Sequence, residues 1–340
     1  MYNRILGCLS MVAIGDALGM PSHDMTIDQI KESFGGALNA FRPAPEDSRV
    51  HKGYKAAQIT DDTLLTLSVA DAYIQNRGTI SSRIIAEMTS AVVNEYSKRG
   101  LDKMFGPSTK NSVEGFLSGN DPETMFMRDN HPTMGTSNGG AMKISPVGLV
   151  HPGHLEGVIG DTLKVCLPSH GTQTAISAAS AIAAGISRAM MPGADVFSVV
   201  RSALRGAEAG ELMGRRKART VPLPSVSKRI KLAVSIALKA DDIETANRDL
   251  SEMIGTGLAA YESIPTAIGI FVACGGDPVK CVMAGANVGF DTDTIASMAG
   301  ALAGTLKGFD SVPMELFSKV QRVNQLELEK VAAGLENLIV

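Results

Sequence analysis

Two acidic segments far apart in the sequence carry residue types that bind metal ions. They are the runs Thr60-Asp61-Asp62-Thr63 and Asp291-Thr292-Asp293-Thr294. Neighbouring carboxylates repel each other, so a fold that keeps them ionised needs a cation or strong hydrogen-bond donors nearby. If the two segments faced each other, four carboxylates and several threonine hydroxyls would converge on one place.

The residue types in these segments also indicate which metal and which chemistry to expect. Neither segment contains His or Cys, and hard oxygen donors suit Mg²⁺ or Mn²⁺ better than Zn²⁺ or Cu²⁺. Four carboxylates match the charge of two divalent ions, and a pair of ions about 3.5–4 Å apart can lower the pKa of a bridging water. We therefore predict a two-metal hydrolytic site. The alternative is that each segment only caps a helix, a position that Thr and Asp favour.

Helical spacing of apolar residues surrounds both segments and predicts a mostly helical protein. The expected helices cover residues 63–75, 82–96, 174–190, 194–213, 226–239, 243–259, 277–288, 294–306 and 313–337. The helix over 174–190 is apolar nearly all round, so we expect it at the centre of the core.

Three segments rich in Gly, Pro, Ser or Asn are predicted as loops. They cover residues 41–58, 102–143 and 151–172, and long loops inside a helical domain are often functional. Four histidines, His51, His131, His151 and His154, fall in loops and are assigned no role in the site. No linker or composition shift divides the chain, so we predict a single domain over residues 1–340.

Composition excludes several classes of partner. The chain has 32 basic and 35 acidic residues and a net charge of −3, so bulk charge favours neither nucleic acid nor an anionic membrane. The four cysteines show no metal-ligand spacing, and this pattern predicts free thiols in a reducing compartment. The apolar run from Met1 to Ile14 lacks a signal-peptide cleavage site, and the later Ala-rich runs are too short or too polar to span a bilayer. The predicted location is therefore the cytoplasm, without membrane insertion. The sequence gives no indication of the oligomeric state.

In its motifs the chain resembles the ADP-ribosylglycohydrolase family along nearly its whole length. The motifs follow the family's order: Gly15-Asp16-Ala17-Leu18-Gly19, then Thr60-Asp61-Asp62-Thr63, then Gly135-Thr136-Ser137-Asn138-Gly139-Gly140-Ala141-Met142, the His170 loop, and Gly289-Phe290-Asp291-Thr292-Asp293-Thr294. Each motif is only moderately specific, but the ordered set is highly specific. The resemblance implies an all-α, single-domain orthogonal helical bundle with long functional loops around a dinuclear metal cleft.

The resemblance also implies roles for individual residues. Two Mg²⁺ or Mn²⁺ ions would be held by Thr60, Asp61, Asp62, Asp291, Asp293 and Thr294. Asp61, Asp62 and Asp293 would be catalytic, with Asp293 between the two ions, and Asp16 would support the centre from behind. Substrate would contact His23, Phe105, Gly106, Ser137, Asn138, Gly139, Gly140 and His170. The glycine-rich part of this set would hold the ribose and the diphosphate, because such backbone can approach phosphate oxygens closely.

Two positions depart from the family's pattern. His23 stands where members commonly carry Glu, and Lys143 stands where they frequently carry Arg, which can bind phosphate with two parallel hydrogen bonds. The predicted function is a metal-dependent hydrolase that cleaves a ribosyl glycosidic bond, with ADP-ribose released from a protein or a small-molecule conjugate. The alternatives are a hydrolase of a nucleoside or another small ribosyl conjugate, a non-catalytic ADP-ribose- or nucleotide-binding module, and a phosphohydrolase.

Overall fold

The computed structural model describes residues 1–128 and 131–339. No β-strand forms within these ranges, and only two isolated bridges, Ser137 with Ala259 and Thr172 with Arg219, join neighbouring segments. The predicted all-α fold is therefore confirmed.

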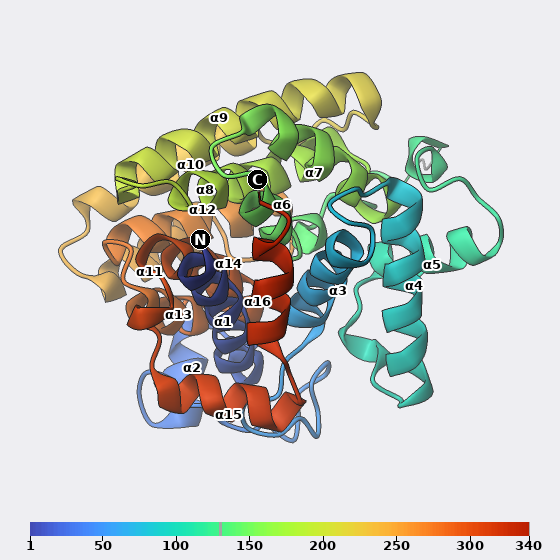
Figure 1. Cartoon of the computed structure of the whole chain (residues 1–340). Coiled ribbons are helices and arrows are strands. Elements are labelled where there is room, and N and C mark those ends of the chain that lie inside the picture. The colour runs from blue at the N-terminus through green and yellow to red at the C-terminus, as the bar shows by residue number, and fades with distance from the viewer. Residues whose placement is uncertain (129–130, 340) are drawn as a thin grey trace.

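Helices of very different lengths make up this fold (Figure 1). The α-helices are α1 (Tyr2–Gly19), α2 (Ile27–Phe34), α3 (Asp61–Gln75), α4 (Ser82–Lys98), α5 (Pro107–Leu117), α6 (Ser145–Val150), α7 (Leu155–His170), α8 (Gln173–Ala189), α9 (Val196–Lys217), α10 (Val226–Lys239), α11 (Ile243–Met253), α12 (Ala260–Ala273), α13 (Pro278–Ala286), α14 (Thr292–Lys307), α15 (Met314–Asn324) and α16 (Leu328–Glu336). The 3₁₀ turns are η1 (Met20–Ser22), η2 (Asp102–Met104), η3 (Met125–Arg128), η4 (Asn138–Gly140) and η5 (Phe309–Ser311).

Helices α1 and α14 pack against each other at unusually close range in the core. A Cβ atom added at Gly15 would lie 2.5 Å from the carbonyl oxygen of Ala296, so any larger residue would force the helices apart. At the end of this contact, the Thr292 hydroxyl donates to the carbonyl oxygen of Gly19 over 2.8 Å. The packing therefore brings the last turn of α1 to the acidic first turn of α14.

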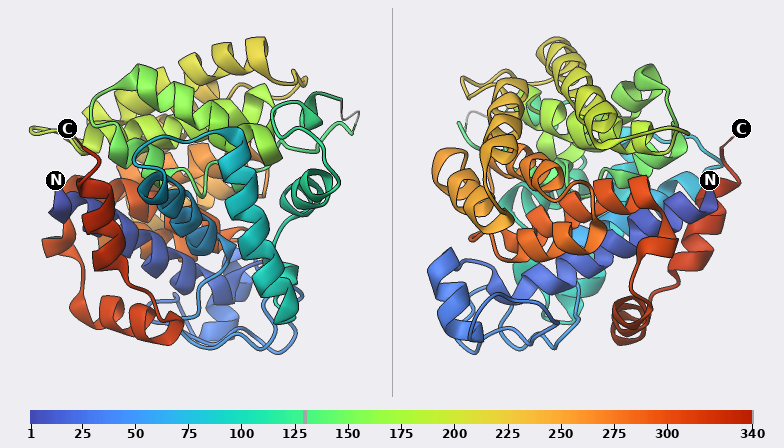
Figure 2. Two further views of the ribbon diagram at one scale, coloured as in Figure 1. Left: turned by 45° about the vertical axis from the view of Figure 1, so that its right-hand side comes forward. Right: turned by 90° about the vertical axis from the view of Figure 1, so that its left-hand side faces the viewer.

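The Ala-rich helix α8 confirms the central buried helix that the sequence predicts over residues 174–190. It packs against α7, α9, α12 and α14, and nearly all of its residues are buried. Both ends of the described chain lie on one side of the molecule (Figure 2), where the Tyr2 amide donates to Glu336 Oε1 over 2.7 Å.

Among the described residues, one segment, Tyr2–Ser22, is long and apolar enough to cross a membrane by length and composition. In the fold this segment is the core helix α1 with the turn η1, and its most apolar window is completely buried.

Several predicted boundaries are wrong. Most of the expected loop over 151–172 is the helix α7, part of the expected loop over 102–143 is α5, and the single helix expected over 313–337 is α15 and α16. The helices α1 and α12 were not predicted. Both are buried on nearly all sides, and a helix without a polar face lacks the periodicity that identifies it. Pro residues inside α7 and α12 also argue against a helix at these positions in the sequence.

Candidate metal centre and substrate cavity

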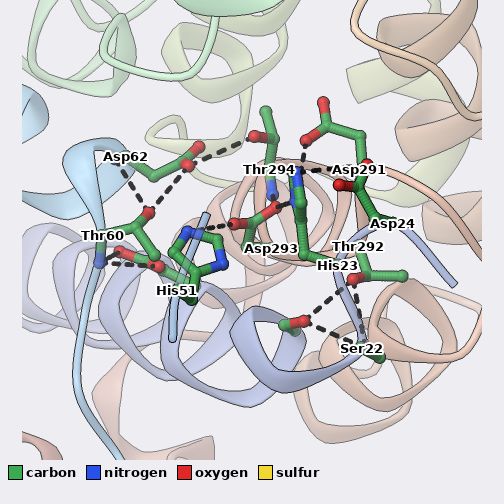
Figure 3. Close-up of polar contacts among 12 residues, drawn as sticks. Ser22, His23, Asp24, His51, Thr60, Asp62, Asp291, Thr292, Asp293 and Thr294 are labelled. Carbon is green, nitrogen blue, oxygen red and sulfur yellow. Dashed lines mark hydrogen bonds and ion pairs between the residues drawn. The ribbon is translucent and has the colours of Figure 1, made fainter. Parts of the chain in front are cut away.

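The two acidic segments meet at the first turns of α3 and α14 (Figure 3). Thr294 Oγ1 donates to Asp62 Oδ2 over 3.2 Å, and Thr60 Oγ1 donates to the same oxygen over 3.2 Å. Hydroxyls from both segments therefore hold one carboxylate, as the sequence predicts for two segments that face each other.

Asp16 on α1 fixes the position of the first segment. Its carboxylate accepts hydrogen bonds from the Thr60 amide over 3.0 Å and from the Thr63 amide over 3.1 Å, and the Thr63 hydroxyl also donates to it. Asp16 is fully buried. It thus holds the start of α3 from behind, which is the supporting role that the sequence predicts.

The second segment is held by other contacts. Asp293 Oδ1 accepts the Thr294 amide hydrogen over 3.0 Å, and Asn138 Nδ2 donates to Asp291 Oδ2. Asp291 stands at the N-cap of α14 but makes no capping hydrogen bond. Simple helix capping therefore does not explain why an aspartate is needed at this position.

Two histidines stand beside Asp293. His23 Nδ1 lies 2.9 Å from Asp293 Oδ1 and His51 Nε2 lies 3.8 Å from Asp293 Oδ2, with the two rings edge to face at 5.1 Å between centroids. One donor atom from each of these three residues falls within 4.8 Å of the others. The sequence predicted His23 in the site as a substrate contact, but it did not predict His51 there.

Burial and mutual repulsion perturb the acidic groups strongly. Burial, together with repulsion from Asp293 and Asp16, raises the pKa of Asp61 and Asp62 well above the usual value. Burial also raises the pKa of Asp291 to about 7. Asp293 behaves differently. Burial acts to raise its pKa, but the adjacent His23 outweighs burial and lowers the pKa below the usual value. The fold thus gathers carboxyl groups that, apart from Asp293, burial and mutual repulsion make hard to ionise.

The two imidazoles respond to this charge in opposite ways. Although burial disfavours the charged form of His23, the carboxylates of Asp293 and Asp291 raise its pKa to about 10. For His51 burial prevails and lowers the pKa to about 4, so its ring is neutral near pH 7 and can offer a lone pair.

The residues present fit a divalent cation. Asp62 Oδ1 is buried and has no hydrogen-bond partner within the described part of the chain, an arrangement that is unfavourable for a carboxylate oxygen unless a cation binds it. The carboxylates, threonine hydroxyls and imidazoles around it are donors that Mn²⁺ and Mg²⁺ accept, with nitrogen better suited to Mn²⁺.

A cavity of about 650 Å³ opens over this cluster. Its wall includes Asp61, Asp62, Asp291, Asp293, Thr294, His23, Phe105, Gly106, Ser137, Asn138, Gly139 and His170. The structure thus brings together all but two of the residues predicted for the site. Thr60 donates to Asp62 but does not line the cavity, and Gly140 packs against Cys166 and His170.

The loop that begins at Ser137 is pinned to the start of α12. The Asn138 amide donates to the Leu258 carbonyl over 2.9 Å, and the Ala260 amide donates to the Thr136 carbonyl over 3.1 Å. A Cβ atom at Gly139 would lie 2.7 Å from the His170 ring, so the absence of a side chain lets that ring lie directly against the loop.

Lys143 is not in the cavity wall. It is 1% exposed and donates to Ser169 Oγ over 3.1 Å, so it does not replace a phosphate-binding Arg in the cavity. The sequence also gave no sign of the apolar wall formed by Met134, Leu258 and Tyr261, because these residues come from segments without a shared motif.

Comparison with known proteins places the chain among glycohydrolases. The sequence profile of the ADP-ribosylglycohydrolase family matches residues 1–339. The chain is 31% identical to the uncharacterized protein YegU of Escherichia coli (strain K12), over 98% of this chain and 96% of that protein. It is 26% identical to ADP-ribosylhydrolase ARH3 of Homo sapiens, over 92% and 87% of the two chains. It is 24% identical to ADP-ribosylarginine hydrolase Tri1 of Pseudomonas putida (strain GB-1), over 96% and 77%.

A solved structure shares the fold. The chain superposes on an ADP-ribosylglycohydrolase-related protein complex with a TM-score of 0.63 at 19% identity, covering 100% of this chain and 99% of that chain.

Proposed function

The chain belongs to the ADP-ribosylglycohydrolase family, and we propose that it is a metal-dependent glycosidase that releases ADP-ribose from a modified protein or a small-molecule conjugate. Membership supports the hydrolysis of ADP-ribose glycosidic linkages. The observation that carries the proposal is the cavity in which the two acidic helix starts and the Ser137 loop face one space. Its volume is in the range that small-molecule sites occupy.

The metal part of the proposal rests on the donor groups of the cluster. Asp62, Asp291, Asp293 and Thr294 would hold one or two divalent ions together with Thr60 and Asp61, and His51 adds a neutral nitrogen. Bound there, Mg²⁺ or Mn²⁺ would supply Lewis acidity and lower the pKa of water. The unpartnered Asp62 Oδ1 supports this assignment.

Among the four clustered aspartates, Asp61 is best placed to move a proton. It is 9% exposed, whereas Asp62 is 2% and Asp293 is 3% exposed. Hydrolysis adds water across the bond between C1″ of the ribose and the leaving group, so one carboxylate must take a proton from water while the leaving group gains one. Asp61 reaches the cavity, and burial together with repulsion from Asp293 raises its pKa above the usual value.

The rest of the cavity suits ADP-ribose. The glycine-rich Ser137 loop offers backbone that can approach diphosphate oxygens closely. Phe105, Met134 and Tyr261 offer apolar and aromatic surface against which a nucleobase could pack. The two kinds of surface border one cavity, as a ligand with a charged middle and an apolar base requires.

An assay on the full chain with added Mn²⁺ or Mg²⁺ tests the proposal. The name of the relative Tri1 makes ADP-ribosyl-arginine the first substrate. ADP-ribosyl-serine, O-acetyl-ADP-ribose and free nucleosides are assayed beside it. Release of ADP-ribose that disappears in Asp61→Asn supports the proposal. Release of ribose from nucleosides alone, release of phosphate, or ADP-ribose binding without turnover of any compound would each replace it with one of the alternatives.

A further inference from the structure

A row of four polar side chains runs from the buried core to the cavity wall. Lys143 Nζ donates to Ser169 Oγ over 3.1 Å, and Ser169 Oγ lies 2.8 Å from His170 Nδ1. His170 Nε2 in turn lies 3.0 Å from Ser137 Oγ, which reaches the cavity. The first three residues are at most 1% exposed, so water cannot supply missing partners.

The lysine end of this row determines which atom donates at each step. An ammonium group can only donate, so Ser169 Oγ accepts from Lys143. In the described part of the chain, the Ser169 hydroxyl has one remaining acceptor within reach, His170 Nδ1. A buried hydroxyl hydrogen without an acceptor is unfavourable by about 1–3 kcal/mol, so Ser169 donates to Nδ1.

His170 continues this direction of hydrogen-bond donation from the core toward the cavity. Burial and the nearby Lys143 lower the pKa of His170 well below its usual value, so the ring is neutral, with one donor and one acceptor nitrogen. Because Nδ1 accepts, the hydrogen is on Nε2 and is donated to Ser137 Oγ. The Ser137 hydroxyl hydrogen is then left to point into the cavity.

We propose that Lys143 is a positioning residue that orients this row, so that Ser137 presents a hydrogen-bond donor to the diphosphate of the ligand. The inference rests on the proposed function only for the identity of the ligand. A donor at Ser137 favours an anionic oxygen over a ligand N–H or hydroxyl hydrogen. Lys143 thus acts on the ligand without touching it, which is a different role from that of an Arg that binds phosphate directly.

The position of the histidine proton tests the row without any ligand. In the full chain labelled with ¹⁵N-histidine, with His170 assigned through His170→Gln, NMR is expected to show the Nε2–H tautomer. Lys143→Met, which keeps length but cannot donate, is expected to shift His170 toward a mixture of both tautomers. An Nδ1–H tautomer in the unmodified protein, or an unchanged tautomer in Lys143→Met, would overturn the proposal. The first of these outcomes does not depend on the folding of Lys143→Met.

Binding of ADP-ribose tests the consequence at Ser137. By calorimetry, Lys143→Met and Ser137→Ala are each expected to weaken binding about tenfold, and the double variant is expected to bind no more weakly than Ser137→Ala alone. Ser169→Ala, which interrupts the row at its middle, should reproduce Lys143→Met. Ser177→Ala removes a buried hydroxyl that donates to the Ala207 carbonyl and should leave affinity unchanged.

If the affinity losses of Lys143→Met and Ser137→Ala multiply in the double variant, Lys143 acts independently of Ser137, which contradicts the proposal. If the unmodified protein binds no ADP-ribose, the proposed function fails instead, and the tautomer measurement still decides the direction of the row.

Discussion

The hydroxyl of Thr294 donates to Asp62 Oδ2 over 3.2 Å, although the two residues stand 232 positions apart in the chain. Thr60 donates to the same oxygen from the other side. One carboxylate oxygen is thus held by both helix starts, and the other oxygen, Oδ1, is left without a protein partner in the described residues. The contact that joins α3 to α14 also orients the oxygen that is free to bind a cation.

Loss of the Thr294 hydroxyl should therefore weaken metal binding. A hydrogen bond to a charged group contributes about 1.5–3 kcal/mol, and about 1.4 kcal/mol corresponds to tenfold in affinity. We expect Thr294→Val to lower the affinity for Mn²⁺ at least tenfold by calorimetry. Thr305→Val is the matched control, because Thr305 is buried on the same helix and its hydroxyl donates to the Ala301 carbonyl, away from the acidic cluster. Equal losses in both variants would show a general effect on α14 rather than an effect on the site.

Removing the Asp62 charge should have opposite effects on metal affinity and on the stability of the metal-free protein. Burial and the surrounding carboxylates disfavour its ionised form, so Asp62→Asn is expected to raise the Tm in EDTA. The same substitution should reduce Mn²⁺ affinity by about a hundredfold or more, because one anionic ligand is lost. Thermal unfolding with EDTA and with Mn²⁺ measures both.

Asp161→Asn provides the control for this prediction. Asp161 is also buried, but it is paired with His151 and Lys164 away from the cavity. Its replacement should lower the Tm and leave Mn²⁺ affinity unchanged. An Asp62→Asn protein that binds Mn²⁺ as tightly as the unmodified chain would remove Asp62 from the set of ligands.

The neutral ring of His51 should make the site prefer Mn²⁺ over Mg²⁺. Imidazole nitrogen suits transition metals, whereas Mg²⁺ favours oxygen. We expect His51→Ala to lower Mn²⁺ affinity about tenfold and to change Mg²⁺ affinity much less, with both ions measured by calorimetry on the same preparations. A similar loss for both ions would show that His51 supports the fold of the site and does not bind the metal.

The meeting of the two acidic segments could be predicted because each one begins a helix and carries its own chemical pattern. Thr60 and Thr294 both stand within one turn of a helix start, so their position along the chain limits where their side chains lie. The Ser137 loop and His170 could be identified in the same way, through motifs that the family shares.

His51 could not be predicted by such reasoning. It lies in a loop, and its place beside Asp293 depends on tertiary contacts, including the hydrogen bond from the Ala44 amide to the Tyr54 carbonyl that closes this loop. Lys143 shows the same limit in another form. Its motif showed only that Lys replaces a frequent Arg, and not that the side chain turns to Ser169 in the core, because side-chain direction is decided by packing rather than by spacing.

The buried ammonium of Lys143 should make the protein less stable near neutral pH than it would be with an apolar residue there. Burial lowers the pKa of Lys143 from 10.5 to about 8, which corresponds to a penalty of about 3 kcal/mol for the charged form. Below pH 8 the lysine is protonated in both the folded and the unfolded chain, so the penalty is fully present. Between pH 8 and 10.5 the unfolded chain binds more protons than the folded chain, so stability rises with pH and the penalty disappears.

Lys143→Met should consequently raise the Tm at pH 7 by up to about 4 °C for a chain of this length, and the difference from the unmodified protein should shrink as pH rises from 8 to 10.5. Calorimetric scans of both proteins across this range measure the difference, in which the titration of all shared groups cancels. A difference that stays constant with pH would mean that Lys143 keeps its ordinary pKa in the fold. Greater stability combined with weaker ADP-ribose binding would show that the buried charge is kept for the ligand, since it does not serve the fold.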